Sequence, residues 1–475
     1  MKIEKEFIEG LYEALPEETR HYLDIAIEKI VEAKRRGGKV VVVTGSGPNI
    51  HEGVTTLIAE FINKGLIDGV TTSSAVVSHE MGGVLDKVKR INIHDVGEEF
   101  LDFSKMPRGD IFELTELTDA QWADLKKEMI IDDALVQRCN EKEGTVIIKA
   151  AANMAYPMGL RNETFAASIM EIAHTKHVPF EEVVGWGCDE RTMLGAGVRN
   201  NVPVLVSVPQ LIGGGQVGIS IADSIPVSDR TFRISKMLGS ADVIIESAVA
   251  LTQEIHDGPF ETYTGHGIWA SWNGYPTYSL KDKTLIRFDL DENLKKAWDL
   301  DKKSGEVQAA IDKGLPKTKM SKIPFRMEMS AFSRLEKSIP VVGDIGVLWS
   351  VMALKVSQAL NIDLDENLKK AWDLDKKSGE VQAAIDKGLP KTKMSKIPFR
   401  MEMSAFSRLE KSIPVVGDIG VLWSVMALKV SQALNIELDY ISYPQQTEPG
   451  KAMREWIVDN IDYMKMDKIK EWLNK

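Results

Sequence analysis

The hydrophobic pattern of the chain is most regular at residues 40–43, where four valines follow one another and a glycine-containing turn comes next. An unbroken β-branched run bounded by such a turn is typical of a parallel strand that is buried on both faces. In residues 51–64 the apolar positions recur at helical spacing, so we predict a helix there. Backbone N–H groups at the start of this helix would then point into the turn and suit a phosphate group.

The same alternation of apolar runs and amphipathic segments continues along the chain. Five further strands are predicted at residues 66–72, 145–150, 202–208, 241–248 and 284–290, and helices at 163–174 and 229–238. Strands that alternate with helices indicate a mostly parallel sheet with helices on both faces. We therefore expect an α/β, doubly wound, Rossmann-like fold with helical additions at both ends.

The predicted domain organisation follows the same pattern. Its parts are N-terminal amphipathic helices (1–37), the Rossmann-like core (38–288), two copies of one segment (289–362 and 363–436), and a C-terminal strand and amphipathic helix (437–475). Within the core, residues 95–143 are polar and charged, so we interpret them as an excursion or lid. Thr118 and Gln121 have the spacing of a capping box and predict a helix start inside this excursion.

The two copies in the C-terminal part are identical at all 74 positions. Repeats of solenoid proteins are shorter and diverge while they keep their core positions, so this is a different kind of repetition. Either a recent in-frame tandem duplication or an artefact of cloning explains it. Two identical segments cannot occupy one docking site, so we expect one copy to complete the core.

Composition and charge narrow the classes of partner. The net charge is −11 with a pI near 5.4, which disfavours a nucleic-acid surface and favours small-molecule or protein partners. Cys139 and Cys188 are the two cysteines, so no disulfide framework is suggested. The apolar stretch 345–354 is shorter than the ~20 residues of a membrane-spanning helix. We expect a soluble cytoplasmic protein.

Several short segments together resemble a known family. Residues 37–53 are similar to the NAD-binding domain of archaeal and cyanobacterial ornithine cyclodeaminases of the LOR/SDH type, which carry a GGK-strand-GP-x-x-IH-x-G pattern there. The likeness continues at residues 64–69, 75–80, 199–204, 240–245, 288–291 and 342–346, with the copy of the last at 416–420. More distantly the same segments resemble deoxyhypusine synthase, whose fold that domain shares. The resemblance implies NAD as cofactor, an amine or amino-acid substrate and a homo-oligomer.

The candidate cofactor-binding residues lie in turns and at strand ends. Glycine turns offer backbone N–H groups to a pyrophosphate, and a strand-end aspartate can accept ribose hydroxyls. These residues are Gly45, Ser46, Gly47, Asn49, Asp68, Gly213, Gly214, Asp289, Asp291 and Asp344. The alternative for the glycine turn is that it only lets strand and helix pack, because Ile50 replaces the third glycine of G-x-G-x-x-G. The alternative for the aspartates is that they only cap strand ends.

Two groups of residues are candidates for acid–base catalysis. Imidazole titrates near neutral pH and a carboxylate beside it raises its basicity, so the pair His79 and Glu80 is the first group. The second is His256, Asp257 and His266 in a glycine-rich loop. Glycine-rich or polar loops at 153–161, 209–223 and 256–267 all follow predicted strands, where α/β sheets bind ligands. A histidine that merely satisfies the core or a cap is the alternative.

Two weaker signals concern metal and thiol chemistry. Cys188 comes at a predicted helix start, where a thiol pKa can be lowered, although a structural cysteine is the alternative. His174 and His177 have helical spacing for a zinc site but lack a third ligand, and we expect no metal.

Three functions agree with these patterns. The first is an NAD-binding enzyme of redox-neutral amine or amino-acid chemistry, resembling ornithine cyclodeaminase, a lyase. The second is a non-catalytic, nucleotide-binding assembly protein in which the surplus copy is adhesive. The third is an aminobutyl transferase like deoxyhypusine synthase, which needs an activated lysine that the sequence does not place.

Overall fold

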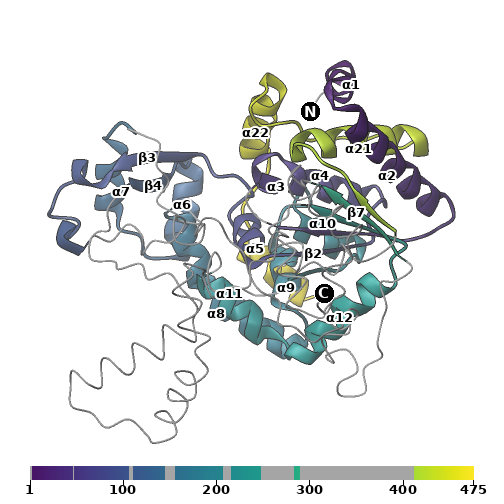
Figure 1. Ribbon diagram of the computed structural model, residues 1–475. Helices are drawn as coiled ribbons and strands as arrows, with labels where there is room; N and C mark the ends of the chain where they lie inside the picture. Colours follow the sequence, from purple (N-terminus) through teal and green to yellow (C-terminus); the bar gives the residue numbers. More distant parts are fainter. Residues whose placement is uncertain are drawn as a thin grey trace, which may run out of the picture. The chain divides into compact units, whose positions relative to one another are not determined.

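The computed structural model describes residues 3–45, 48–105, 111–144, 156–206, 215–247, 283–288 and 411–475. The chain divides into two compact units, residues 1–296 with 403–475 and residues 297–402, and the described residues belong to the first. They contain a six-stranded sheet and a separate two-stranded sheet (Figure 1). All pairings in the larger sheet are parallel, which confirms the predicted α/β fold.

The six strands lie in the spatial order β5-β2-β1-β6-β7-β8. Numbered along the chain from one to six, they follow the order 3-2-1-4-5-6, which is the doubly wound order of dinucleotide-binding folds. Their bounds are β1 Val40–Thr44, β2 Gly69–Thr72, β5 Val204–Val206, β6 Val243–Ser247, β7 Thr284–Phe288 and β8 Ser412–Pro414. The direction of winding reverses between β1 and β6, so the ligand crevice is expected where those two strands end.

The valine run forms the buried centre of this sheet. All four valines of β1 are at most 1% exposed. Val40 and Val42 belong to the hydrophobic core on one face of the sheet, and Val41 and Val43 belong to the core on the other. The prediction of a strand buried on both faces is therefore confirmed, and Thr44 lies beside Ser247 of β6 in register.

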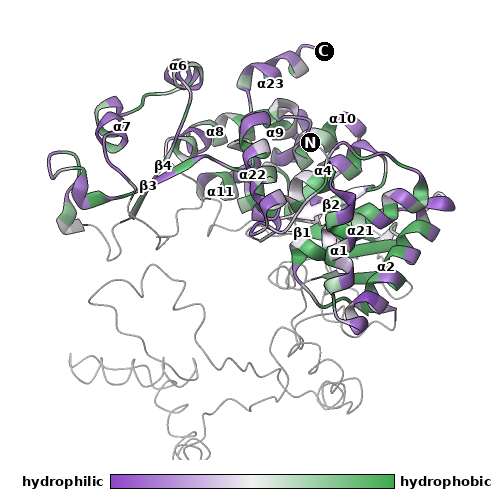
Figure 2. Ribbon diagram, turned by 90° about the horizontal axis from the view of Figure 1, so that it is seen from above, coloured by the Kyte–Doolittle hydropathy of each residue, from purple (hydrophilic) through white to green (hydrophobic). Residues whose placement is uncertain are grey.

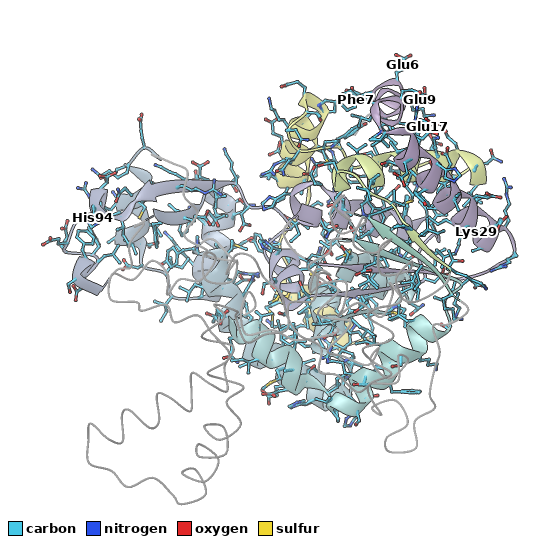
Figure 3. The ribbon with its side chains drawn as sticks, viewed as in Figure 1. Glu6, Phe7, Glu9, Glu17, Lys29 and His94 are labelled. Carbon is cyan, nitrogen blue, oxygen red and sulfur yellow. The ribbon has the colours of Figure 1, made fainter. Side chains whose placement is uncertain are left out.

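The N-terminal segment forms two amphipathic helices, α1 Lys5–Ala14 and α2 Glu17–Arg35, which pack against α21 Ile419–Leu434 (Figure 1). On α1, Glu6 and Glu9 are exposed while Phe7 packs against Tyr443, with 6.0 Å between ring centroids (Figure 3). Hydrophobic residues colour one side of α2 and hydrophilic residues the other (Figure 2). This amphipathic pattern is what buries both helices on one face.

The predicted helix at 51–64 is two helices, α3 Pro48–His51 and α4 Val54–Asn63. Gly53 separates them with a φ of 70°. A Cβ at this position would collide with Tyr440 Oη and Met453 Sδ, so only glycine fits both the backbone angle and the space. The turn after β1 therefore leads into one turn of helix rather than a long one.

Other predicted boundaries also shift. The helices predicted at 163–174 and 229–238 are present as α8 Met158–Lys176 and α12 Val227–Gly239. Parts of two predicted loops are helical, because α8 begins at Met158 and α11 spans Gly215–Ser224. Residues 437–447 form no strand, and the C-terminal helix is broken into α22 Glu448–Asn460 and α23 Met466–Leu473.

Part of the segment interpreted as an excursion pairs with the strand before it in a two-stranded sheet that is separate from the six-stranded sheet (Figure 1). Strands β3 Val88–Asn92 and β4 Ile111–Thr115 pair antiparallel, and helices α6 Asp119–Glu128 and α7 Asp133–Asn140 follow. The predicted capping box is confirmed, since Thr118 and Gln121 cap α6 reciprocally. The strand predicted at 145–150 lies outside the described residues.

The sixth strand comes from the second copy of the repeated segment. Strand β8 and helix α21 lie within residues 411–436, and the equivalent residues of the first copy lie outside the described part. Among the described helices, none is both long and apolar enough to cross a lipid bilayer.

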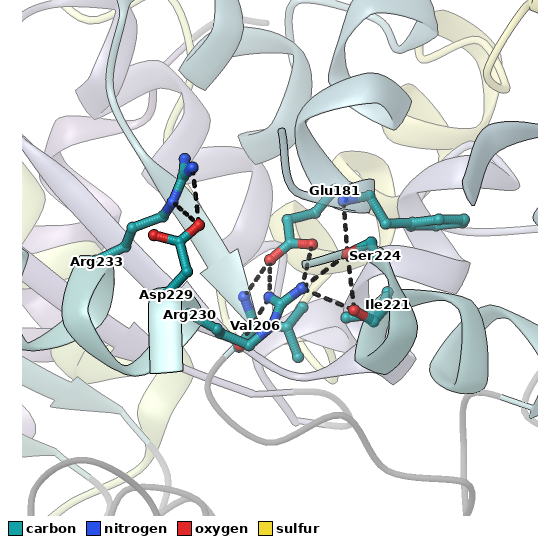
Figure 4. A network of polar contacts seen from close by, with 8 residues as sticks. Glu181, Val206, Ile221, Ser224, Asp229, Arg230 and Arg233 are labelled. Carbon is teal, nitrogen blue, oxygen red and sulfur yellow. Dashed lines mark hydrogen bonds and ion pairs between the residues drawn. The ribbon is translucent and has the colours of Figure 1, made fainter. Parts of the chain in front are cut away.

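A buried ion pair joins three helices to the end of β5 (Figure 4). The Arg230 guanidinium of α12 pairs with Glu181 of α9 Phe180–Gly187 and donates to the Ile221 carbonyl and Ser224 Oγ of α11, at 2.8 and 3.0 Å. Glu181 also accepts from the Val206 backbone N–H at 2.9 Å. The pair fixes the helices around β5.

Candidate functional site

A series of hydrogen bonds links the end of β1, helix α3, the end of β6 and helix α21. Asn49 Nδ2 donates to the Gly45 carbonyl at 3.2 Å, and Ser247 Oγ donates to Asn49 Oδ1 at 2.5 Å. Trp423 Nε1 of α21 donates to Ser247 Oγ at 2.8 Å. Asn49 and Ser247 are both fully buried. This series of hydrogen bonds therefore connects the ends of β1 and β6 at the point where the direction of winding reverses.

Buried hydroxyls line the same edge of the sheet. Thr44 ends β1 beside Ser247, and Thr72 ends β2. The hydroxyls of Thr44, Thr71 and Thr72 are buried and have no hydrogen-bond partner among the described residues. A buried hydroxyl without a partner costs about 1–3 kcal/mol, so a polar group brought to this edge would relieve that cost.

The predicted catalytic pair lies on α5 Ser74–Met81, which follows β2. Glu80 is 1% exposed, and its two carboxylate oxygens accept hydrogen bonds from the backbone N–H groups of Met193 and Leu194, at 2.8 and 2.9 Å. It thereby caps α10 Met193–Asn200. Burial raises its pKa to about 7. The Glu80 carboxylate therefore accepts hydrogen bonds from the first backbone N–H groups of α10. The neighbouring His79 is half-buried and has interactions of its own.

Asp68 lies at the opposite edge of the sheet from Gly45. Its Oδ2 accepts from the backbone N–H of Val40, the first residue of β1, at 2.8 Å and from Lys34 Nζ at 2.9 Å. Val40 and Gly45 lie at opposite ends of β1, so Asp68 lies far from the turn that begins at Gly45. It caps the beginning of a strand, which was the structural alternative for this residue.

Of the predicted cofactor-binding residues, the structure thus brings Gly45 and Asn49 into contact. The remaining predicted residues lie outside the described part of the chain: Ser46, Gly47, Gly213, Gly214, Asp289, Asp291, Asp344, His256, Asp257 and His266.

The weaker signals have structural explanations. Cys188 is fully buried beside Glu80, and burial raises the pKa of its thiol far above the usual range. His174 Nε2 lies 2.6 Å from the Asp223 carbonyl. Within the described ranges, no group of three or more metal-ligating side chains comes together.

A polar cluster that the sequence analysis did not single out lies just after the turn. Glu52 is 5% exposed and accepts from the backbone N–H and Nε2 of Gln445, at 2.6 and 2.9 Å. Arg454 Nη1 of α22 donates to Gln445 Oε1 at 2.9 Å and lies 3.3 Å from His51 Nδ1. His51 and Glu52 were visible beside the glycine turn. Arg454 comes about 400 positions later, and no local pattern marks it.

Burial also raises the pKa of Glu52, and the neighbouring Asp418 carboxylate raises it further. Hydrogen bonds from Gln445 and the charge of Arg454 oppose this shift. The cluster therefore contains a carboxyl group with a weakened tendency to ionise, one turn of helix away from Asn49.

No protein-family model and no curated protein sequence matches this chain. Among solved structures, AgrE in a ternary complex with ornithine and NAD+ is similar at 12% identity and a TM-score of 0.29, covering 59% of this chain and 29% of AgrE. A LOR/SDH protein from Methanococcus maripaludis S2 is similar at 9% identity and a TM-score of 0.32, covering 89% of this chain and 70% of that protein. This chain spans less than a third of AgrE. Similarity at these scores carries no conclusion about activity.

Proposed function

We propose that this chain binds NAD where β1 and β6 end and uses it in redox-neutral chemistry on an amine or amino acid. The observation that carries the proposal is the reversal of winding between β1 and β6, with Gly45, Asn49 and Ser247 joined at that point. Doubly wound sheets bind dinucleotides in the crevice at such a reversal.

The described residues fit a dinucleotide in two ways. Gly45 is buried and continues into the glycine turn, so the backbone can come close to a pyrophosphate. The hydroxyls of Thr44 and Thr72, which have no hydrogen-bond partner among the described residues, offer donors and acceptors at the same edge. Helix α3 has only four residues, so we assign the phosphate contacts to the N–H groups of the turn rather than to a long helix dipole.

Within this proposal, NAD+ supplies reversible hydride acceptance from an amine-bearing carbon, which makes that carbon electrophilic without net oxidation. The chain's own residues bind and orient the two ligands. Asn49 fixes the turn, and the cluster of His51, Glu52 and Arg454 lies beside it. The resemblance of residues 37–53 and 75–80 to ornithine cyclodeaminases supports conversion of ornithine to proline as the specific reaction.

The first experiment is calorimetric titration of the purified chain with NAD+. In Asn49→Asp the donor to the Gly45 carbonyl is lost and a negative charge stands beside the proposed pyrophosphate. We expect at least about a tenfold loss of NAD+ affinity, equivalent to about 1.4 kcal/mol, because the loss of this hydrogen bond and the charge repulsion both oppose NAD+ binding.

The matched control is Asn140→Asp, the same change at the exposed end of α7, which should leave NAD+ affinity unchanged. A wild-type chain that binds no NAD+ and releases no ammonia from an amino-acid panel would refute the proposal.

The second candidate, an assembly protein, is favoured by one observation. The second copy supplies β8 and α21 to the core, and two identical segments cannot occupy one place, which leaves the first copy for a role in assembly. Removing one copy separates the two candidates, because an enzyme should keep its activity while an assembly protein should change its oligomeric state.

A further inference from the structure

Arg454 is anchored through one of its three guanidinium nitrogens. Its Nη1 donates to Gln445 Oε1 at 2.9 Å and to the His51 carbonyl at 3.4 Å. Gln445 is in turn held by the Glu52 carboxylate through two hydrogen bonds. The guanidinium plane is therefore oriented by α3, α22 and the segment that precedes α22.

The other edge of the guanidinium has no hydrogen-bond partner among the described residues. Nε and Nη2 make no hydrogen bond with any residue in the described ranges, and Arg454 has no carboxylate there within ion-pair distance. An arginine carries five N–H donors, and two of its nitrogens together match a carboxylate or phosphate in a bidentate pair. The described part of the fold therefore orients this donor edge and leaves it without a partner there.

The electrostatic surroundings of Arg454 favour an anion. Arg454 is half-buried, and this burial lowers the pKa of its guanidinium. Glu52 raises that pKa, and the positive charge of Arg90 lowers it again. The Glu52 carboxylate is already engaged by Gln445, so it compensates Arg454 only from a distance. Arg90 is itself paired with Glu113 at 2.6 Å, so among the described residues Arg454 is the one of the two cations without a carboxylate partner. A half-buried cation is costly unless an anion joins it.

We propose that the Nε–Nη2 edge of Arg454 is the receptor for the carboxylate of an amino-acid substrate. The identity of this ligand rests on the proposed function, while the oxyanion-binding geometry does not. Arg454 approaches His51, two residues after Asn49, so a carboxylate bound there would lie beside the proposed cofactor site. On this proposal the substrate is an α-amino acid, because a simple diamine has no carboxylate for Arg454 to hold.

A phosphate of the dinucleotide has the same oxyanion chemistry, so the test must separate the two sources. Ornithine and 1,4-diaminobutane are suitable probes because they differ only in the carboxylate. Binding of each is measured by calorimetry on the full chain, with and without NAD+, and NAD+ binding is measured separately. These readouts need no turnover.

We expect Arg454→Gln to lose about 10–100-fold in ornithine affinity, the range of a charge-assisted hydrogen-bond pair. Binding of 1,4-diaminobutane and NAD+ should stay within about twofold, because neither would use the Arg454 edge. Arg454→Lys keeps the charge but loses the fork, so an intermediate ornithine affinity is expected. Lys451→Gln removes an exposed charge from the same helix and should change nothing.

An unchanged preference for ornithine over 1,4-diaminobutane in Arg454→Gln, at an unchanged melting temperature, would overturn the proposal. A loss of NAD+ affinity instead of ornithine affinity would also overturn it and would assign the oxyanion to the dinucleotide. If wild type binds ornithine through Arg454 but does not bind NAD+, the proposed function fails and this inference stands.

Discussion

At the residue scale, Glu80 shows how burial redirects a side chain that the sequence marks as catalytic. Next to His79 it has the pattern of an acid–base pair, yet its carboxylate caps the start of α10. A neighbouring imidazole is a local feature, whereas the partner that Glu80 uses is 113 positions away. The sequence places Glu80 a few residues after the predicted strand 66–72, but it could not place that partner.

Glu80 also makes stability depend on pH. Its pKa rises from 4.5 to about 7 in the folded protein, so the folded state favours the protonated form. This contribution to stability is fully present below pH 4.5 and is lost as pH rises through 7. Glu80→Gln stays neutral, so the free energy of unfolding of wild type should fall relative to this variant between pH 5 and 8, on the order of 1–3 kcal/mol.

Urea unfolding at a series of pH values measures this difference. Glu9→Gln, an exposed change on α1, is the control and should follow wild type. A difference between Glu80→Gln and wild type that stays constant over the whole pH range would contradict the assignment.

At the element scale, hydrophobic periodicity predicts which segments are helices and strands, and tertiary contacts set where they stop. The helix predicted at 51–64 is interrupted at Gly53 because Tyr440 and Met453 pack against it from the C-terminal part of the chain. The C-terminal helix likewise breaks before α23. Lys465, the residue before α23, donates its backbone N–H to the Gly187 carbonyl at 2.9 Å. This contact with a residue distant in the sequence lies at the break.

The ion pair of Arg230 and Glu181 gives a prediction at this scale (Figure 4). Arg230→Ala leaves the buried Glu181 carboxylate without its cation, so we expect a loss of about 3–5 kcal/mol in the free energy of unfolding. Arg233→Ala on the same helix breaks a half-exposed pair with Asp229 and should cost less than about 1 kcal/mol.

Urea unfolding of the two variants side by side makes the comparison. Equal losses in both variants would show that the buried pair does not hold α9, α11 and α12 around β5.

At the scale of the whole molecule, the chain builds one sheet from widely separated segments. Strands β6, β7 and β8 continue the sheet on the far side of β1, and β8 belongs to the second copy of the repeat. The two copies have the same sequence, so no local preference distinguishes them.

Removing either copy yields the same single-copy protein, which tests this arrangement. Strand β8 and helix α21 remain available, and the connection from β7 to β8 becomes shorter. The strand and helix that complete the sheet are retained, so the single-copy protein should be about as stable as wild type. Circular dichroism, thermal unfolding and NAD+ titration measure the outcome, and loss of cooperative unfolding would contradict it.

The sequence by itself determined the α/β class, the buried strand at 40–43 and the capping box of α6, because each depends on a pattern of nearby residues. Only the tertiary structure decided that Asn49 meets Ser247, that Arg454 meets His51, that Asp68 lies at the far edge and that the second copy supplies β8. These outcomes depend on contacts between segments up to about 400 positions apart, for which hydrophobic periodicity carries no information.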